Sequence, residues 1–132
     1  KHHIEPQKKY IFFLDSLRCD NRRYLNVEGV IHAYFAMDPA ERPTAFYVNS
    51  DMMAAELIKS FQSHGVSVPQ EIEIIGFGDT HSASIITPEL TTVSVPFQNI
   101  GEAAIRLLLN KISGLETEDT YFKLSLIKRD SA

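Results

Sequence analysis

Short apolar runs alternate with amphipathic stretches over the first half of the chain. Residues 10–14, 44–48 and 72–77 are rich in aromatic or aliphatic side chains, and continuous runs of this length are typical of strands buried on both faces of a sheet. From Asp51 to Phe61, apolar residues recur at helical intervals. The pattern predicts a strand, a helix and a further strand in succession over this region.

An earlier segment, residues 22–37, is also predicted to be a helix. Its apolar side chains have mixed but mainly helical spacing, Asp20 or Asn21 offers a capping side chain at its start, and an Asp-Pro pair stops it. Because strands and helices alternate over residues 10–77, we expect a parallel sheet with helices on its faces. The expected fold class is α/β, with a mostly parallel sheet flanked by helices.

The last third of the chain has a different pattern. Residues 90–95 suit an extended connector, and Pro96 is well placed at the start of a helix that ends at Gly114. Residues 121–129 alternate over part of their length, as a half-buried or edge strand does. The predicted helix carries a broad apolar stripe made of Phe97, Ile100, Ala104, Leu107, Leu108 and Ile112.

Composition narrows the class of protein. A chain of 132 residues with 44% apolar content can build one compact core. Its 17 acidic and 13 basic residues give a net charge of -4, so no cationic surface for nucleic acid is expected on this chain. The single Cys19 and the scattered histidines predict neither a disulfide framework nor a metal site. We expect no cofactor.

The same composition predicts the cellular compartment of the chain and the activities to expect of it. A lone cysteine favours a reducing cytoplasm, and no apolar stretch approaches the roughly 20 residues of a membrane span, so no membrane partner is expected. The chain does not begin with methionine, which indicates that it is part of a longer protein. Ser50, Cys19 and His81 are possible nucleophiles or bases, but no motif pairs them. We therefore expect no enzymatic activity.

Several short segments follow one another in an order that resembles the LacI/GalR family of bacterial transcription regulators. The resemblance covers roughly residues 43–132, whereas residues 1–42 match only as a strand followed by a helix containing Gly29. The segments that carry it are Pro43-Thr44-Ala45, Asn49-Ser50-Asp51-Met52-Met53-Ala54, Gly65-Val66-Ser67-Val68-Pro69, Ile74-Ile75-Gly76-Phe77-Gly78-Asp79, Thr87-Pro88-Glu89-Leu90-Thr91-Thr92-Val93, the helix with Gly101, and Leu126-Ile127-Lys128-Arg129.

The resemblance implies half of a type I fold similar to that of periplasmic binding proteins, in which two α/β subdomains close on a small molecule. Residues 1–92 would form the C-terminal subdomain of the effector-binding domain. Residues 93–120 would be a hinge crossing and a helix that normally belongs to the N-terminal subdomain, and residues 121–132 a return strand and tail. The apolar stripe would then lack its usual partner, so the isolated chain should dimerise, swap elements or repack.

The same analogy predicts where a ligand binds. In open parallel sheets ligands lie at the carboxyl ends of strands, which are residues 15–17, 49–51 and 77–80 here. A few polar groups would orient a small effector while the Phe77 ring covers one of its faces. The candidate ligand-binding residues are Asn26, Ser50, Asp51, Phe77 and Asp79.

Two of these candidates have a structural alternative, and two positions depart from the family. Asp51 is equally suited to capping a helix, and Asp79 to stabilising a turn. Asn26 stands where sugar- and purine-binding relatives have an arginine, and Gly78 where they have a second acid. Asparagine lacks the bidentate grip of a guanidinium, so a sugar specificity is not carried over to this chain.

By resemblance, the chain senses a small effector, a sugar or related metabolite, and controls DNA binding by a headpiece that it does not itself contain. Such regulators are homodimers, and effector binding shifts the population between two subdomain orientations. The alternatives are an exported sugar-binding receptor of the periplasmic type, or a degenerate sensor that serves only in dimerisation. The predicted dimer interface consists of Ala55, Leu57, Ile58, Phe61, Ser82 and Ile85.

Overall fold

A four-stranded sheet in the order β3-β4-β5-β6 forms the centre of the computed structural model, which describes residues 16–19, 22–25 and 27–132. The strands β3, β4 and β5 are parallel, and β6 runs antiparallel to β5 at the edge. The sheet thus confirms the expected mostly parallel α/β class. The strands are β3 (Ala45–Tyr47), β4 (Glu73–Gly78), β5 (Thr91–Ser94) and β6 (Ser125–Ile127).

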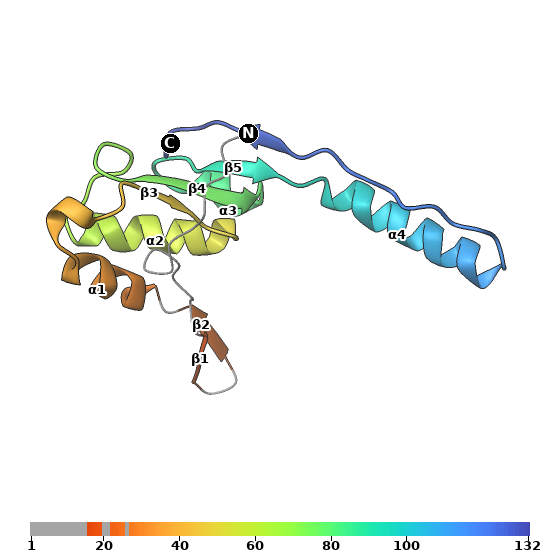
Figure 1. Ribbon diagram of the computed structural model, residues 1–132, viewed down its shortest axis with the longest axis horizontal. Helices are drawn as coiled ribbons and strands as arrows, with labels where there is room; N and C mark the ends of the chain where they lie inside the picture. The colour runs from red at the N-terminus through yellow and green to blue at the C-terminus, as the bar shows by residue number, and fades with distance from the viewer. Residues whose placement is uncertain (1–15, 20–21, 26) are drawn as a thin grey trace.

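Helices connect the parallel strands; the alternating pattern predicted the helix after β3 but not the short helix after β4. The helix α2 (Asp51–Ser63) links β3 to β4, and the short α3 (His81–Ile85) links β4 to β5. Figure 1 shows α2 lying along one face of the sheet, with α1 (Glu28–Ala36) on the outer side of α2. A single 3₁₀ turn, η2 (Pro39–Glu41), separates α1 from β3. The result is a layered arrangement of sheet, helix and helix.

The hydrophobic core lies between the sheet and α2. Ile58, Phe61 and Ile74 are fully buried there, because the helical repeat of α2 and the alternation of β4 direct these side chains to the same interface. The ring of Tyr34 on α1 meets that of Phe61 edge to face at a centroid distance of 5.1 Å. Burial of these apolar side chains is the main force that holds α1, α2 and the sheet together.

The start of the first described helix corrects the sequence-based prediction. Residues 22–37 do not form one helix: Arg22–Leu25 is a strand, β2, paired antiparallel with β1 (Ser16–Cys19), and α1 begins only at Glu28. The position before the helix is occupied by Val27 without a side-chain capping bond. The predicted capping residues, Asp20 and Asn21, lie outside the described residues. The strand predicted at residues 10–14 lies outside the described residues.

The C-terminal tail joins β4 to β5 beyond the end of β6. Ser131 is completely buried, and its hydroxyl donates to the carbonyl of Ile74 at 2.6 Å while accepting the N–H of Thr91 at 2.9 Å. The Ser131 carbonyl in turn accepts the N–H of Ile74 at 2.9 Å. One serine therefore satisfies backbone groups on two neighbouring strands. The strand predicted at residues 121–129 is shortened to β6.

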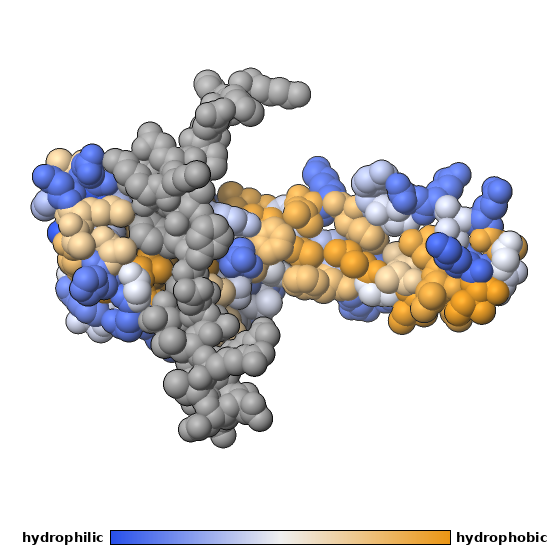
Figure 2. All heavy atoms as spheres, turned by 60° about the horizontal axis from the view of Figure 1, so that its bottom comes forward, coloured by the Kyte–Doolittle hydropathy of each residue, from blue (hydrophilic) through white to orange (hydrophobic). Residues whose placement is uncertain are grey.

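The helix α4 (Phe97–Ile112) projects away from the sheet, and the chain that follows it runs back alongside (Figure 1). Figure 2 shows hydrophobic side chains gathered over this projecting part. Leu108 is 59% exposed and Ile112 is 73% exposed, so these side chains of the apolar stripe are not covered by the described part of the chain. No helix in the described part of the chain is long and apolar enough to cross a membrane.

Candidate functional site

Two of the three predicted strand ends meet at one edge of the sheet. The segment after β3 leads through Asn49 and Ser50 into α2, and the turn after β4 contains Asp79 and Thr80. The backbone N–H of Thr80 donates to Oδ2 of Asp51 at 2.6 Å, which places the two segments in direct contact. The third predicted strand end, residues 15–17, is not confirmed: residue 15 lies outside the described residues, and Ser16 and Leu17 belong to β1 in a separate two-stranded sheet. No side chain before Val27 is described.

Asp51 is a buried connector between three elements. Asp51 is only 1% exposed. Oδ2 also accepts the hydroxyl of Thr80 at 3.1 Å, and Oδ1 accepts the hydroxyl of Thr92 on β5. Because the single hydroxyl proton of Thr80 goes to Asp51, the Thr80 oxygen accepts from the Ser82 hydroxyl at 3.0 Å. The carboxylate therefore fixes the turn after β4 and the strand β5 to the start of α2.

One glycine of β4, Gly76, makes room for this carboxylate, and a second, Gly78, has an unusual backbone conformation. A Cβ atom on Gly76 would lie 2.4 Å from Oδ1 of Asp51 and 2.7 Å from a methyl carbon of Leu90. Gly78 has a φ of 128°, which side-chain-bearing residues rarely adopt. Gly78 thus ends β4 in a backbone conformation that suits glycine.

Asp79 is held by an ion pair across the sheet edge. Its φ of 54° lies in the left-handed region, which aspartate tolerates in turns, and its Oδ1 accepts a hydrogen bond from Nη2 of Arg129 at 2.7 Å. Arg129 also donates through Nη1 to the carbonyl of Leu90 at 2.8 Å. The ion pair between Arg129 and Asp79 joins residues that are 50 positions apart in the sequence. No local sequence pattern predicts such a contact. Arg129 and Thr92 stand in segments that carry the family resemblance, but neither was predicted to act at the site.

The polar groups that remain accessible at this edge are few. Asn49 is exposed, and Ser50 and Phe77 are half-buried. The ring of Phe97, which is 58% exposed, lies close enough that a Cβ on Gly78 would be 3.7 Å from its Cε2. The sequence pattern assigned Phe97 only to the apolar stripe of α4, whereas in the structure its ring lies next to Gly78 at the strand-end site. Asn26 lies outside the described residues.

Most of the residues predicted for a dimer interface are covered by the chain itself. Ala55, Leu57, Ile58 and Phe61 are between 0% and 8% exposed and belong to the hydrophobic core. Helical spacing identified the apolar face of α2 correctly, but that face packs on the sheet instead of a partner. For these four residues the interface prediction does not fit the structure. Ile85, which is 68% exposed, and the half-buried Ser82 remain candidates.

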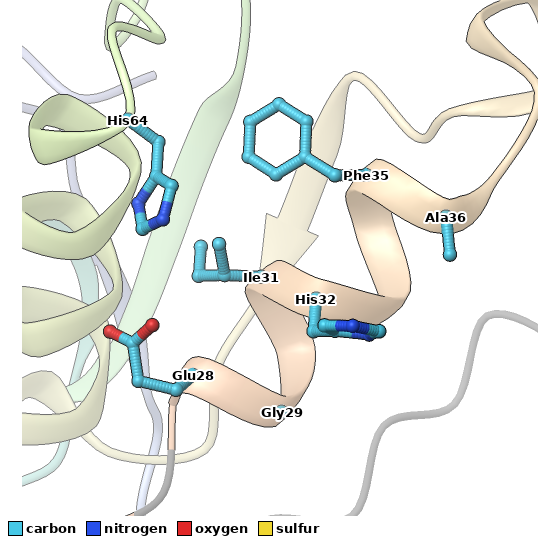
Figure 3. A pocket seen from close by; sticks show the side chains of 7 residues that line it. All are labelled: Glu28, Gly29, Ile31, His32, Phe35, Ala36 and His64. Atoms are coloured by element: carbon cyan, nitrogen blue, oxygen red, sulfur yellow. The ribbon is translucent and has the colours of Figure 1, made fainter.

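A separate surface hollow lies between α1 and the end of α2, away from the strand ends (Figure 3). Phe35 and His64 face each other across it, with ring centroids 5.7 Å apart, and Nδ1 of His64 is 2.8 Å from the carbonyl oxygen of Ser60. Figure 3 shows the rings of His32 and His64 pointing in different directions. Among the described residues, no group of three or more metal-ligating side chains could hold a metal ion.

Comparison with known proteins is consistent with this geometry. Residues 12–132 match the family model described as periplasmic binding protein-like domain. Catabolite control protein A of Priestia megaterium is 40% identical over 84 residues, which is 64% of this chain and 25% of that protein. The transcriptional repressor PurR of Erwinia tasmaniensis is 37% identical over 93 residues, 69% of this chain and 27% of that protein. The chain thus spans about a quarter of the length of these relatives.

Solved structures give the same assignment. A LacI family transcriptional regulator from Lactobacillus casei with bound sucrose superposes with a TM-score of 0.67 at 33% identity, covering 80% of this chain and 39% of that one. The lac repressor dimer bound to operator and the anti-inducer ONPF gives a TM-score of 0.63 at 30% identity, covering 67% and 32%. The chain belongs to the periplasmic binding protein-like domain family, in the form found in the effector-binding domains of LacI-family transcription regulators.

Proposed function

We propose that this chain is the ligand-sensing part of a LacI/GalR-like transcription regulator. It binds a small effector, a sugar or related metabolite, at the carboxyl ends of β3 and β4, and the bound effector controls DNA binding by a headpiece elsewhere in the protein. Such a regulator would act in the cytoplasm and would perform no catalysis. The observation that carries the proposal is the contact between Asp51 and Thr80, which brings two polar strand-end segments together.

The accessible groups suggest how a ligand would be held. The rings of Phe77 and Phe97 offer apolar faces, and Asn49 offers an amide that both donates and accepts hydrogen bonds. The carboxylates of Asp51 and Asp79 already accept bonds from Thr80, Thr92 and Arg129. We therefore assign Asp51 and Asp79 to shaping the site, and the direct contacts to Asn49, Ser50 and Phe77. Asn26 remains a proposed ligand contact.

A thermal-shift screen tests the proposed binding activity. The probes are cellobiose and sucrose, which are bound in related structures, together with sugar acids and nucleobases. A probe that binds the native state at about 100 times its Kd raises the free energy of unfolding by roughly 2.7 kcal/mol, which appears as a higher Tm. Asn49→Ala should reduce that shift, because the amide is lost from the exposed strand end.

Asn99→Ala is the matched control, since Asn99 is also an exposed asparagine but lies on α4. It should leave the probe-induced shift unchanged. Equal losses in both variants, or no shift with any probe in the full-length regulator, would count against ligand sensing at the strand ends.

The helix α4 is proposed to be the part of this chain that belongs to the second subdomain. We divide the chain into a C-terminal subdomain at residues 1–92, a hinge crossing and helix at residues 93–120, and a return strand and tail at residues 121–132. The burial of residues in α2 contrasts with the exposure of Leu108 and Ile112 in α4, as expected if α4 normally packs on a segment that this chain lacks.

Sedimentation of the isolated chain separates two ways of self-association. With its apolar stripe uncovered, the chain should associate at micromolar concentration. Leu108→Glu should restore the monomer if association occurs through α4, because a charge on the stripe opposes burial. Ile85→Glu should do so if α3 forms the proposed homodimer interface. A chain that is monomeric at all concentrations would contradict self-association through α4 and through α3 alike.

A sensor that serves only in dimerisation is the second candidate function. The observation that favours it is that Asp51 and Asp79 are both bonded internally, and the resemblance implies an acid at the position of Gly78. On this alternative, no probe shifts the Tm and Ile85→Glu alone abolishes dimers of the full-length protein. The thermal-shift and sedimentation results together decide between the two functions.

A further inference from the structure

The turn after β4 is tied to β5 at two separate points. One tie runs through Asp51, whose carboxylate accepts the N–H and hydroxyl of Thr80 on one side and the hydroxyl of Thr92 on the other. Thr92 is completely buried and Asp51 is 1% exposed. Hydrogen bonds to a buried carboxylate are shielded from competing water, so this tie resists displacement of either end.

The second tie runs through Arg129. Its guanidinium binds the carboxylate of Asp79 at 2.7 Å and the carbonyl of Leu90 at 2.8 Å. Its backbone N–H also donates to the hydroxyl of Thr91 at 2.9 Å. Neighbouring residues of the turn, Asp79 and Thr80, are therefore held to the beginning of β5 by different groups.

Strand β5 continues directly towards α4. Its last residue is Ser94, and α4 begins at Phe97, where the N–H of Phe97 donates to the carbonyl of Val95 at 2.8 Å. The same strand is hydrogen-bonded to β4 on one side and β6 on the other. A displacement of β5 along its own axis would reach α4 through two residues of connecting chain.

We propose that Asp51 and Arg129 are positioning residues that make the turn at residues 78–80 and strand β5 move as one unit, so that a change at the strand-end site is carried to α4. The cause of that change, a bound small molecule, rests on the proposed function. The mechanical connection does not rest on it, because the connection is built from hydrogen bonds within the chain itself.

Hydrogen exchange of the full chain, without ligand, tests the connection. Thr92→Val keeps the shape of the side chain but removes the hydroxyl that donates to Asp51. The backbone N–H of Thr80, which lies in a different element, should then exchange about 10-fold faster, the factor that corresponds to a loss of about 1.4 kcal/mol of local protection. Thr92→Ser restores the hydroxyl and should return Thr80 to the original rate.

Ser94→Ala is the matched control, because it removes a hydroxyl from the same strand, whereas the hydroxyl that donates to Asp51 from this strand belongs to Thr92. It should leave the exchange of Thr80 unchanged. If Thr92→Val accelerates exchange only within β5, or if Thr92→Ser fails to restore protection at Thr80, the proposed connection is wrong.

A reciprocal variant covers the case in which Thr92→Val does not fold. Thr80→Ala changes an exposed residue and leaves its N–H bond to Asp51 in place, so the fold should survive. The amides of β5 should exchange several-fold faster in this variant if the turn and strand are coupled, and unchanged rates there would overturn the proposal. A negative result in the thermal-shift screen would overturn ligand sensing without affecting either exchange measurement.

Discussion

Replacing Asp51 with alanine should lower the free energy of unfolding by about 3 kcal/mol. The substitution removes acceptors for the N–H and hydroxyl of Thr80 and for the hydroxyl of Thr92. Hydrogen bonds to charged groups contribute about 1.5–3 kcal/mol each, and a buried donor left without an acceptor adds a further penalty. Thr92 is buried and has no access to water as a replacement partner, whereas the exposed Thr80 has. This difference keeps the expected loss well below the sum of three such bonds.

Chemical denaturation measures this loss, and Asp38→Ala provides the control. Asp38 also accepts a backbone N–H, that of Ala40 at 2.9 Å, but at an exposed 3₁₀ turn. Loss of a cap of this kind costs about 1 kcal/mol. Equal destabilisation by the two substitutions would show that the buried connections of Asp51 are no stronger than a surface cap, and the account of Asp51 as a connector would fail.

The sequence predicted the elements that carry Asp51 but not its partners. A strand at residues 44–48 followed by a helix from Asp51 is visible in the local pattern, because strand and helix periods differ. The donors on Thr80 and Thr92 come from positions 29 and 41 residues away. Such contacts depend on strand order and register, which a single sequence does not specify. For the same reason, helix capping and ligand contact were both open for Asp51, and tertiary bonding was not considered.

Two errors have a common physical cause. The apolar face of α2 was assigned to a dimer partner, although Ile58 and Phe61 are buried by the chain's own sheet. The helical pattern at residues 22–37 was extended through Arg22–Leu25, which pairs as a strand with β1. In each case the local pattern identified a surface or segment that must find a partner. It did not identify which partner, because packing and strand pairing are decided between distant segments.

The region around α4 was better anticipated because its prediction required only a local pattern. Pro96 precedes α4, and Gly114 follows it with a φ of 74°, as the expected start and stop signals indicate. The sequence pattern predicted an apolar stripe on α4, and Phe97 in that stripe is 58% exposed. The added role of Phe97 beside Gly78 could not be inferred, since it depends on how β5 directs the start of α4.

The second large effect is expected at Gly76, where alanine should cost more than about 2 kcal/mol of unfolding free energy. An added Cβ would lie 2.4 Å from Oδ1 of Asp51 and 2.7 Å from a Leu90 methyl carbon, and overpacking of a buried site typically costs about 1–3 kcal/mol. Gly101→Ala is the control. It has nothing within 4 Å of its added Cβ and lies inside α4, so it should stabilise the helix by about 0.5–1 kcal/mol.

A double-mutant cycle identifies the carboxylate as the cause of the cost at Gly76. In the Asp51→Ala background the nearest clashing atom is gone, and the Leu90 methyl group that remains is the end of a flexible side chain. Gly76→Ala should therefore cost at least about 1 kcal/mol less there than in the original chain, as contacting residues commonly show. Urea unfolding of the four proteins measures this difference. If the free-energy costs of the two substitutions are strictly additive, the cost at Gly76 comes from Leu90 or from the β4 backbone. The Asp51 carboxylate would then not be the reason that this position needs a glycine.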